Sequence, residues 1–147
     1  MKNRVKYLVS ACLCGISCRY DGKSAKDKKI AKLVQAGKAI PFCPEVLGGL
    51  SIPRHKSEIV GGDGNDVIDG RAMVISQKGE DFTSFFLQGA VASLFIAGNF
   101  QIKKAIMKNY SPSCGCGWIK KRGRRVKGDG VTATLFKRAG IKIVQNS

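Results

Sequence analysis

The sequence predicts a single α/β domain, a sandwich with a central, mainly parallel β-sheet between helices. Short apolar runs rich in β-forming residues alternate along the chain with segments whose apolar residues recur at helical spacing. Strands that alternate with helices form parallel sheets through right-handed crossovers. The length of 147 residues, with no linker or internal repeat, fits one domain at residues 1–147 that can bury a core without disulfides.

The first half of the chain predicts two strands and one helix, followed by a long connection. Residues 5–9 form a short apolar run that predicts a strand, and the stripe at 30–34 predicts a helix that Gly37 closes. Residues 39–42 predict the second strand. From 44 to about 70 the composition changes to Gly, Pro, Asp and isolated charges, which predicts a long loop of the kind that is often functional.

The second half predicts two helices and three strands. Residues 72–76 predict a short strand, and a helix should start near Asp81 and run to about 97. This helix is apolar on nearly every side, so we expect it to be buried. Residues 105–107 predict the third principal strand, and the last helix and strand are expected at 131–139 and 141–144.

Three cysteine loops have the same construction, in which an apolar run is followed by cysteine with Gly or Pro close by. They contain Cys12, Cys43 and Cys114, and each follows a predicted strand. Parallel sheets bind ligands beyond the carboxyl ends of their strands. We therefore interpret the three loops as one site at this edge of the sheet.

Charge and hydropathy limit the class of protein. Lys and Arg number 26 against 10 acidic residues, a net charge of +16 that predicts attraction to anions such as nucleotides, RNA or acidic membrane. The apolar run before Cys12 is too short for a signal peptide, and no run approaches the length of a membrane span. We expect a cytoplasmic protein without a membrane partner, in which cysteines serve as metal ligands, catalytic groups or core rather than as disulfides.

The six cysteines allow several kinds of chemistry. Three thiolates around a cubane iron-sulfur cluster leave one iron open to substrate. Alternatively, the C-x-C pairs Cys12/Cys14 and Cys114/Cys116 could wrap one zinc ion, although structural zinc sites prefer longer ligand spacing. A third possibility is a redox or interaction protein in which these pairs form reversible disulfides. Cys14, Cys18 and Cys116 are expected to pack as small apolar residues.

A series of short strings runs through nearly the whole chain in a specific order. They are Val9-Ser10-Ala11-Cys12, Arg19-Tyr20-Asp21-Gly22, Cys43-Pro44-Glu45, Gly48-Gly49-Leu50, Pro53-Arg54, Glu58-Ile59, Asp81-Phe82-Thr83, Gly89-Ala90, Ser111-Pro112-Ser113-Cys114-Gly115 and Gly128-Asp129-Gly130-Val131-Thr132. With them the sequence resembles the thiouracil desulfidase family of bacteria and archaea, long catalogued as a domain of unknown function. The Cys-Pro-Glu and Ser-Pro-Ser-Cys strings are specific when they occur together.

The resemblance implies a [4Fe-4S] enzyme that removes sulfur without redox change from thiouracil or 4-thiouridine monophosphate, giving the oxygen analogue and sulfide. It implies three cluster ligands, which correspond here to Cys12, Cys43 and Cys114. A glutamate and a serine beside the cluster correspond to Glu45 and to Ser111, with Ser113 as the other choice. A carboxylate two residues after a ligand is well placed to deprotonate water. From position alone, Glu45 could equally be a helix cap or a surface charge.

Polar side chains near the cysteine loops are candidates for binding the substrate. They are Arg19, Asp21, Arg54, Lys108 and Ser113, although each charge among them could instead be solvated or ion-paired. Residues 120–127 hold six basic residues in eight, which suits a polynucleotide backbone or a solvated loop. A thiolated tRNA is therefore a second substrate class, and a zinc-stabilised RNA-binding module without catalysis is the alternative function.

Two positions depart from the pattern of the family. Cys14 stands where the family usually has leucine, and Cys116 adds a thiol beside Cys114. Either of them could supply a fourth ligand, and that ligand would close the iron to substrate.

Overall fold

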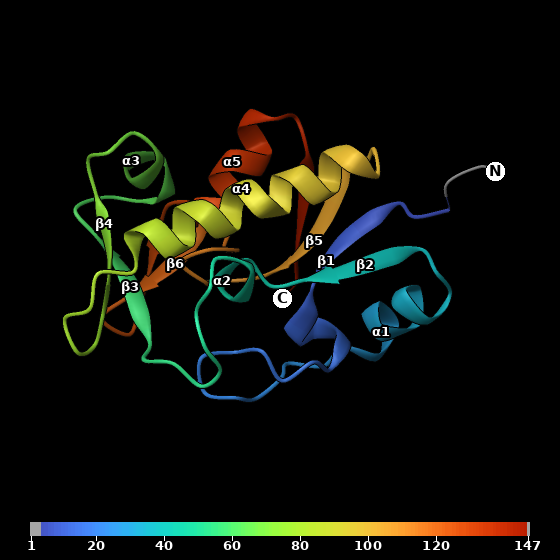
Figure 1. The fold of residues 1–147 in the computed structure, drawn as a ribbon, viewed down its shortest axis with the longest axis horizontal. Coiled ribbons are helices and arrows are strands. Elements are labelled where there is room, and N and C mark those ends of the chain that lie inside the picture. Colours follow the sequence, from blue (N-terminus) through green and yellow to red (C-terminus); the bar gives the residue numbers. More distant parts are fainter. Residues whose placement is uncertain (1–3, 147) are drawn as a thin grey trace.

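The computed structural model describes residues 4–146 and has an α/β fold around a four-stranded, all-parallel sheet (Figure 1). The sheet has the order β2-β1-β5-β8. Its strands are β1 (Tyr7–Ser10), β2 (Ala39–Phe42), β5 (Lys104–Lys108) and β8 (Lys142–Asn146). The helical elements of the chain are η1 (Ala11–Cys14, a 3-10 turn), α1 (Lys28–Gln35), α2 (Pro44–Leu47), α3 (Gly64–Ile68), α4 (Thr83–Asn99) and α5 (Val131–Arg138). The prediction of a parallel α/β sheet is confirmed.

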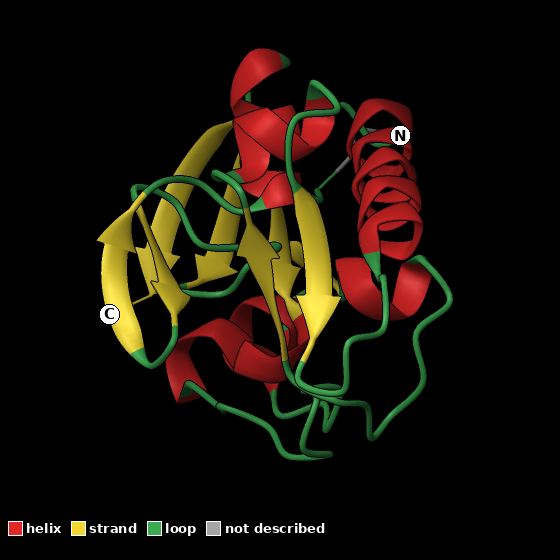
Figure 2. Cartoon of the chain, turned by 90° about the vertical axis from the view of Figure 1, so that its left-hand side faces the viewer, coloured by secondary structure: helices red, strands yellow, loops and turns green. Residues whose placement is uncertain are grey.

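Alternation along the strands builds a core on each face of the sheet. Leu8 packs with residues of α4 and α5, while the next residue, Val9, packs with residues of η1 and α1. Successive side chains of a strand point to opposite faces, so one short apolar run supplies both layers. Figure 2 shows the strands between helices on either side.

A second core lies beside the parallel sheet. The strands β3 (Ser57–Val60) and β4 (Met73–Ser76) pair antiparallel, and Ile59 and Val74 from them pack with Phe82 and Phe86 at the start of α4. Further along, Ala97 of α4 packs in the core of the parallel sheet. Helix α4 therefore joins the two cores.

Helices α2 and α4 touch through glycine. A Cβ atom added at Gly48 would lie 1.9 Å from the carbonyl oxygen of Phe85, and one added at Gly89 would lie 1.9 Å from that of Pro44. Only residues without a side chain allow two backbones to come this close. This contact determines where α2 lies, and with it the start of the segment after Cys43.

The prediction of a long loop at 44–70 is wrong, because the segment contains α2, β3 and α3. The sequence signal for β3 is weak since its partner β4 follows only after α3. Helix α3 starts at a capping box. The carboxylate of Asp63 accepts a hydrogen bond from the backbone of the first turn, and the carboxylate of Asp66 accepts one from the backbone N–H of Asp63. The box is a recognisable start signal that the glycines around it obscured.

The basic run at 120–127 forms an antiparallel hairpin of β6 (Trp118–Lys121) and β7 (Arg124–Lys127). The two turn residues, Arg122 and Gly123, both have positive φ, of 49° and 74°. This is the conformation that a tight two-residue hairpin requires. The run is therefore an ordered arm.

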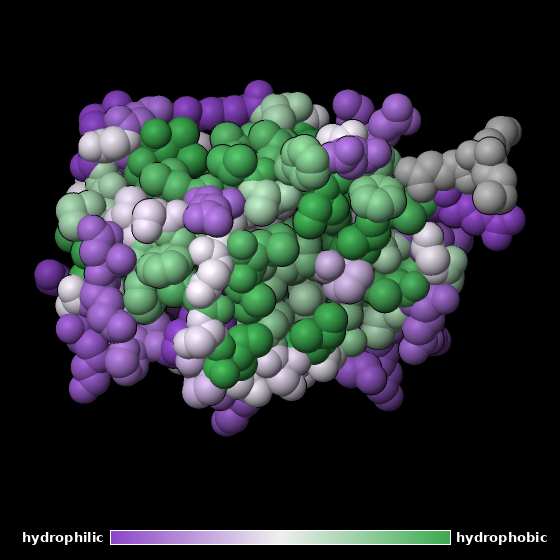
Figure 3. Space-filling view, viewed as in Figure 1, coloured by the Kyte–Doolittle hydropathy of each residue, from purple (hydrophilic) through white to green (hydrophobic). Residues whose placement is uncertain are grey.

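Helix α4 is only partly buried, which corrects the expectation that it is buried on nearly all sides. Val91 and Phe95 are 62% and 71% exposed, because the two cores cover one face of the helix. Figure 3 shows apolar side chains gathered over α4 and the neighbouring α2. Among the helices of residues 4–146, none combines the length and hydrophobicity that a membrane crossing needs.

Candidate functional site

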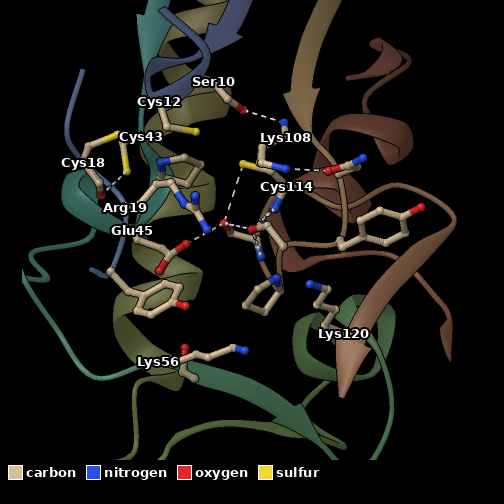
Figure 4. Close-up of a pocket in the computed structure, with 18 of the residues that line it drawn as sticks. Ser10, Cys12, Cys18, Arg19, Cys43, Glu45, Lys56, Lys108, Cys114 and Lys120 are labelled. Carbon is tan, nitrogen blue, oxygen red and sulfur yellow. Dashed lines mark hydrogen bonds between the residues drawn. The ribbon is translucent and has the colours of Figure 1, made fainter. Parts of the chain in front are cut away.

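A cavity of about 180 Å³ opens where β1, β2 and β5 end (Figure 4). Its walls come from the segment at 10–12 after β1, from 43–45 after β2, and from 108–114 at the end of β5. Residues 56–58 of the second core line it as well. The loop at 18–20 and, from the hairpin, Lys120 and Gly123 complete the lining, so six separate segments meet at this cavity.

Four thiols line the cavity, those of Cys12, Cys18, Cys43 and Cys114. Cys18 is buried in the core as predicted, and its thiol also contacts the thiols of Cys12 and Cys43. The Cys12 thiol is the main cause that raises the pKa of Cys18 to about 11, and the Cys18 thiol and burial raise that of Cys43. Burial raises the pKa of Cys114 to about 12. Metal binding at these thiols must therefore displace protons.

The donor set fits a cluster better than a single ion. Tetrahedral zinc at about 2.3 Å from each sulfur needs its ligands within about 4 Å of one another. Within residues 4–146, no group of three or more His, Cys, Asp or Glu side chains is arranged to hold a single metal ion. A cubane binds each thiolate at a different iron, so its ligands stand further apart. Thiols of Cys12, Cys43 and Cys114 around one cavity match that chemistry.

Cys14 and Cys116 do not line the cavity. The Cys14 thiol contacts the carbonyl oxygen of Ser10 at 3.9 Å, and Cys116 lies near Asp129, where burial raises the pKa of its thiol. The structure therefore gives no support to either residue as a fourth ligand. All six cysteines are free thiols.

Glu45 is held at both carboxylate oxygens. It lies in the first turn of α2, where Oε1 accepts a hydrogen bond from Nε of Arg54 at 3.1 Å and Oε2 accepts one from Oγ of Ser113 at 3.1 Å. The hydroxyl of Ser113 is also 3.6 Å from the sulfur of Cys114. Glu45 thus faces the cavity in a fixed orientation beside one of the thiols.

Ser111 organises the loop that carries Cys114. Its Oγ accepts hydrogen bonds from the backbone N–H groups of Ser113 and Cys114, both at 3.1 Å, and lies 3.0 Å from Oγ of Ser113. Ser111 reaches Glu45 only through Ser113. Ser10, which the sequence prediction missed, has its hydroxyl 2.9 Å from the backbone nitrogen of Lys108 and ties the ends of β1 and β5 together.

Four cations line the cavity without an ion-pair partner. They are Arg19, Lys56, Lys108 and Lys120. Within residues 4–146, no carboxylate lies within ion-pair distance of any of them. Burial lowers the pKa of Lys108. The sequence analysis did not name Lys56 or Lys120 individually as binding residues. Only the fold of β3 and of the hairpin brings them to the cavity.

Aromatic rings accompany these cations. The ring of Tyr20 lies 5.9 Å from the charged ends of both Arg19 and Lys56, and the guanidinium of Arg125 lies 4.1 Å from the ring centre of Tyr110. Both rings line the cavity. The wall therefore combines positive charge with flat apolar surface, which suits a planar anionic ligand.

Two predicted binding residues take other places. Asp21 does not line the cavity, and its carboxylate accepts a hydrogen bond from the backbone N–H of Lys23 at 2.9 Å. Arg54 lines the cavity, but its side chain is only 4% exposed and is paired with Glu45. Arg19, Lys108 and Ser113 line the cavity together with Glu45, Ser111 and the three proposed ligands.

Comparison with known proteins supplies the family. A family model described as 2-thiouracil desulfurase matches residues 7–147. The chain belongs to the 2-thiouracil desulfurase family. Membership in this family confirms the resemblance on which the ligand and base assignments were drawn.

Two relatives show how far the similarity extends. The chain is 45% identical over 143 residues to the uncharacterized protein YbbK of Bacillus subtilis (strain 168), a match that covers 95% of each chain. Among solved structures, it matches the [4Fe-4S]-dependent thiouracil desulfidase TudS with a TM-score of 0.84 and 36% identity. This match covers 97% of the present chain and 91% of TudS. The desulfurase fold is therefore shared along nearly the whole chain.

Proposed function

We propose that residues 1–147 form one [4Fe-4S]-dependent desulfidase domain that replaces the sulfur of a thiolated uracil compound with oxygen. The observation that carries this proposal is the cavity shared by the thiols of Cys12, Cys43 and Cys114 and the carboxylate of Glu45. Similarity to the [4Fe-4S]-dependent TudS supports it.

The three thiols would hold the cluster through three of its irons. When bound, the cluster would supply a thiophilic, Lewis-acidic iron that faces the substrate's sulfur. Among the described residues, the other thiol at the cavity is that of Cys18, which contacts the thiols of Cys12 and Cys43. The proposed place for the substrate is the part of the cavity beside Glu45.

Glu45 is the proposed general base. It removes a proton from the water that attacks the carbon bearing sulfur, and sulfide leaves while the carbon keeps its oxidation state. Arg54 and Ser113 bind the two carboxylate oxygens and hold them toward the cavity. Ser111 orients Ser113 and the loop of Cys114, so it supports the base indirectly.

The substrate is proposed to be an anionic thiouracil derivative such as 4-thiouridine monophosphate. The cations at the cavity wall have no carboxylate partner among the described residues, and a phosphate would neutralise them. Tyr20 and Tyr110 offer flat faces beside these charges for a pyrimidine ring.

Anaerobic turnover tests the proposal. Protein purified and loaded without oxygen is incubated with 4-thiouridine monophosphate, 4-thiouridine or 2-thiouracil, and sulfide is measured together with the product, which is uridine monophosphate, uridine or uracil respectively. Iron and acid-labile sulfide are determined on the same preparation. We expect about four irons and four sulfides per chain and the fastest turnover with the nucleotide. Zinc in place of iron, with no sulfide released from any substrate, would favour the RNA-binding module instead.

A thiolated tRNA is a second candidate substrate, because the basic hairpin lies at the mouth of the cavity. Lys120 and Gly123 of the hairpin line the cavity, and the backbone of Lys120 is bonded to that of Tyr110. The cations of the hairpin are Lys120, Lys121, Arg122, Arg124, Arg125 and Lys127. Replacing Arg122 and Arg124 by Glu should slow desulfuration of 4-thiouridine in tRNA while turnover of the mononucleotide is retained.

A further inference from the structure

The side chain of Arg54 is buried, and each of its three nitrogens donates a hydrogen bond within the protein. All three guanidinium nitrogens donate hydrogen bonds: Nε to Oε1 of Glu45 at 3.1 Å, one terminal nitrogen to the carbonyl oxygen of Ser51 at 3.1 Å, and the other to that of Cys18 at 2.9 Å. The side chain is 4% exposed. An arginine this buried persists only when its charge is paired and its donors are bonded.

These contacts leave Arg54 poorly placed to bind a phosphate. Each nitrogen already donates to an acceptor in the protein, and the 4% exposure of the side chain leaves little of the guanidinium open to a substrate anion. The cations Arg19, Lys56 and Lys120 line the same cavity without a carboxylate partner among residues 4–146. Binding of the anion belongs to those side chains rather than to Arg54.

Arg54 instead links the segments that surround Glu45. Its backbone N–H donates to the carbonyl oxygen of Tyr20 at 2.8 Å, and its guanidinium bonds the carbonyl oxygen of Cys18. One residue thus fastens the loop that holds Cys18 and Tyr20 to the carboxylate of Glu45. The planar guanidinium holds these acceptors at fixed angles, which a flexible ammonium group cannot do.

We propose that Arg54 is a positioning residue that orients Glu45 for proton transfer and does not bind the substrate, an inference that rests on the proposed role of Glu45 as base. Ser113 fixes one carboxylate oxygen and Arg54 fixes the other, so loss of Arg54 frees the carboxylate to rotate away from the reacting water.

The kinetic test compares Arg54→Lys and Arg54→Ala with Lys56→Ala in anaerobically loaded protein. We expect kcat for 4-thiouridine monophosphate to fall about 100-fold in both Arg54 variants, with KM changed less than about twofold. Lys56→Ala should do the opposite and raise KM with kcat retained. Uridine monophosphate, measured by calorimetric titration, should bind the Arg54 variants as tightly as the wild type. Loss of its binding, of about tenfold, would overturn the proposal.

A second arm asks whether Arg54 acts through Glu45. In the double variant Glu45→Gln/Arg54→Ala, turnover should be no lower than in Glu45→Gln alone, because there is no base left to orient. Guanidinium ion added to Arg54→Ala should restore part of kcat, and should not do so in the double variant. A further loss in the double variant would show that Arg54 has a role of its own in the reaction.

A third arm does not require turnover. Melting temperatures of the loaded wild type, Glu45→Gln, Arg54→Lys and the double variant Glu45→Gln/Arg54→Lys form a cycle in which the two substitutions should be strongly non-additive, with equal iron content throughout. If no thiouracil compound is turned over by the wild type while this cycle shows coupling, the proposed function fails and the pairing stands. Additive shifts would refute the pairing itself. Arg54→Lys keeps the charge, so this arm remains measurable if Arg54→Ala does not fold.

Discussion

Ser113 brings the proposed base and a proposed ligand into one network. Its hydroxyl bonds Oε2 of Glu45 and lies 3.6 Å from the sulfur of Cys114. It is almost completely buried, so water cannot replace it as the partner of the carboxylate. The second serine of the Ser-Pro-Ser-Cys string, rather than the first, therefore makes the direct contact with Glu45.

At the residue scale, the ligand assignment predicts which thiols hold iron. Serine at Cys12, Cys43 or Cys114 should each abolish the cluster, because two thiolates do not retain it, and Cys18→Ser should leave it bound. Iron and acid-labile sulfide per chain, measured after anaerobic purification, check this. Cys116→Ser serves as the control, since this residue lies outside the cavity. Loss of iron in Cys18→Ser with iron kept in Cys43→Ser would contradict the assignment.

The sequence was sufficient to predict site residues whose role is indicated by their neighbours in the chain. The Cys-Pro-Glu string predicts a thiol and a carboxylate two residues apart at one site, and both line the cavity. It could not separate Arg54 from Arg19, because burial and partner are set by contacts with residues as distant as Cys18. Asp21 illustrates the same limit, since its carboxylate serves its own turn.

At the element scale, the glycine contact between α2 and α4 predicts a sharp difference between two similar substitutions. Gly89→Ala would place a Cβ 1.9 Å from the carbonyl oxygen of Pro44, so α2 must move, and we expect a loss of about 1–3 kcal/mol in the free energy of unfolding. Gly98→Ala lies in the same helix with nothing within 4 Å of the added Cβ, and should stabilise by about 0.5–1 kcal/mol. Urea unfolding of both variants checks this. Equal effects of the two would contradict the contact.

Helix α3 is attached to α5 by an ion pair that predicts acid sensitivity. The hydrogen bond from Arg138 holds the pKa of Asp69 below its usual value. A carboxyl whose pKa is depressed by folding stabilises above its unfolded pKa, and this contribution is lost as pH falls through the folded pKa. The melting temperature should therefore fall below about pH 4. Asp69→Asn should melt lower at neutral pH and show a weaker dependence over this acid range.

Strands marked by one continuous apolar run were predictable from the sequence. Strands that depend on pairing with an antiparallel partner were not. Residues 39–42 match β2 residue for residue, since the run is apolar and ends at a Cys-Pro turn. The hairpin at 118–127 was missed because its strands are basic, although Arg122-Gly123 is a turn signal. Strand β3 depends on a partner beyond α3, which periodicity within one segment cannot reveal.

At the scale of the whole molecule, the charge predicts how substrate affinity responds to salt. The net charge of +16 and the cavity's cations, which have no carboxylate partner within residues 4–146, attract an anionic substrate over a distance set by the Debye length. KM for 4-thiouridine monophosphate should therefore rise between about 0.05 and 0.5 M salt, and KM for uncharged 2-thiouracil should change little. Lys56→Ala should flatten the response to the nucleotide. Equal salt dependence of both substrates would contradict this reading of the cavity.

The proposed ligands come from segments after β1, after β2 and after β5, far apart in the chain. During synthesis, Cys12 and Cys43 leave the ribosome well before Cys114, and until then only two of the three thiols exist outside the exit tunnel. A cluster delivered that early would find an incomplete binding site, and the strand β5 that positions the last loop would not have paired with β1. All three proposed ligands are therefore together only once Cys114 has left the ribosome and β5 has paired with β1.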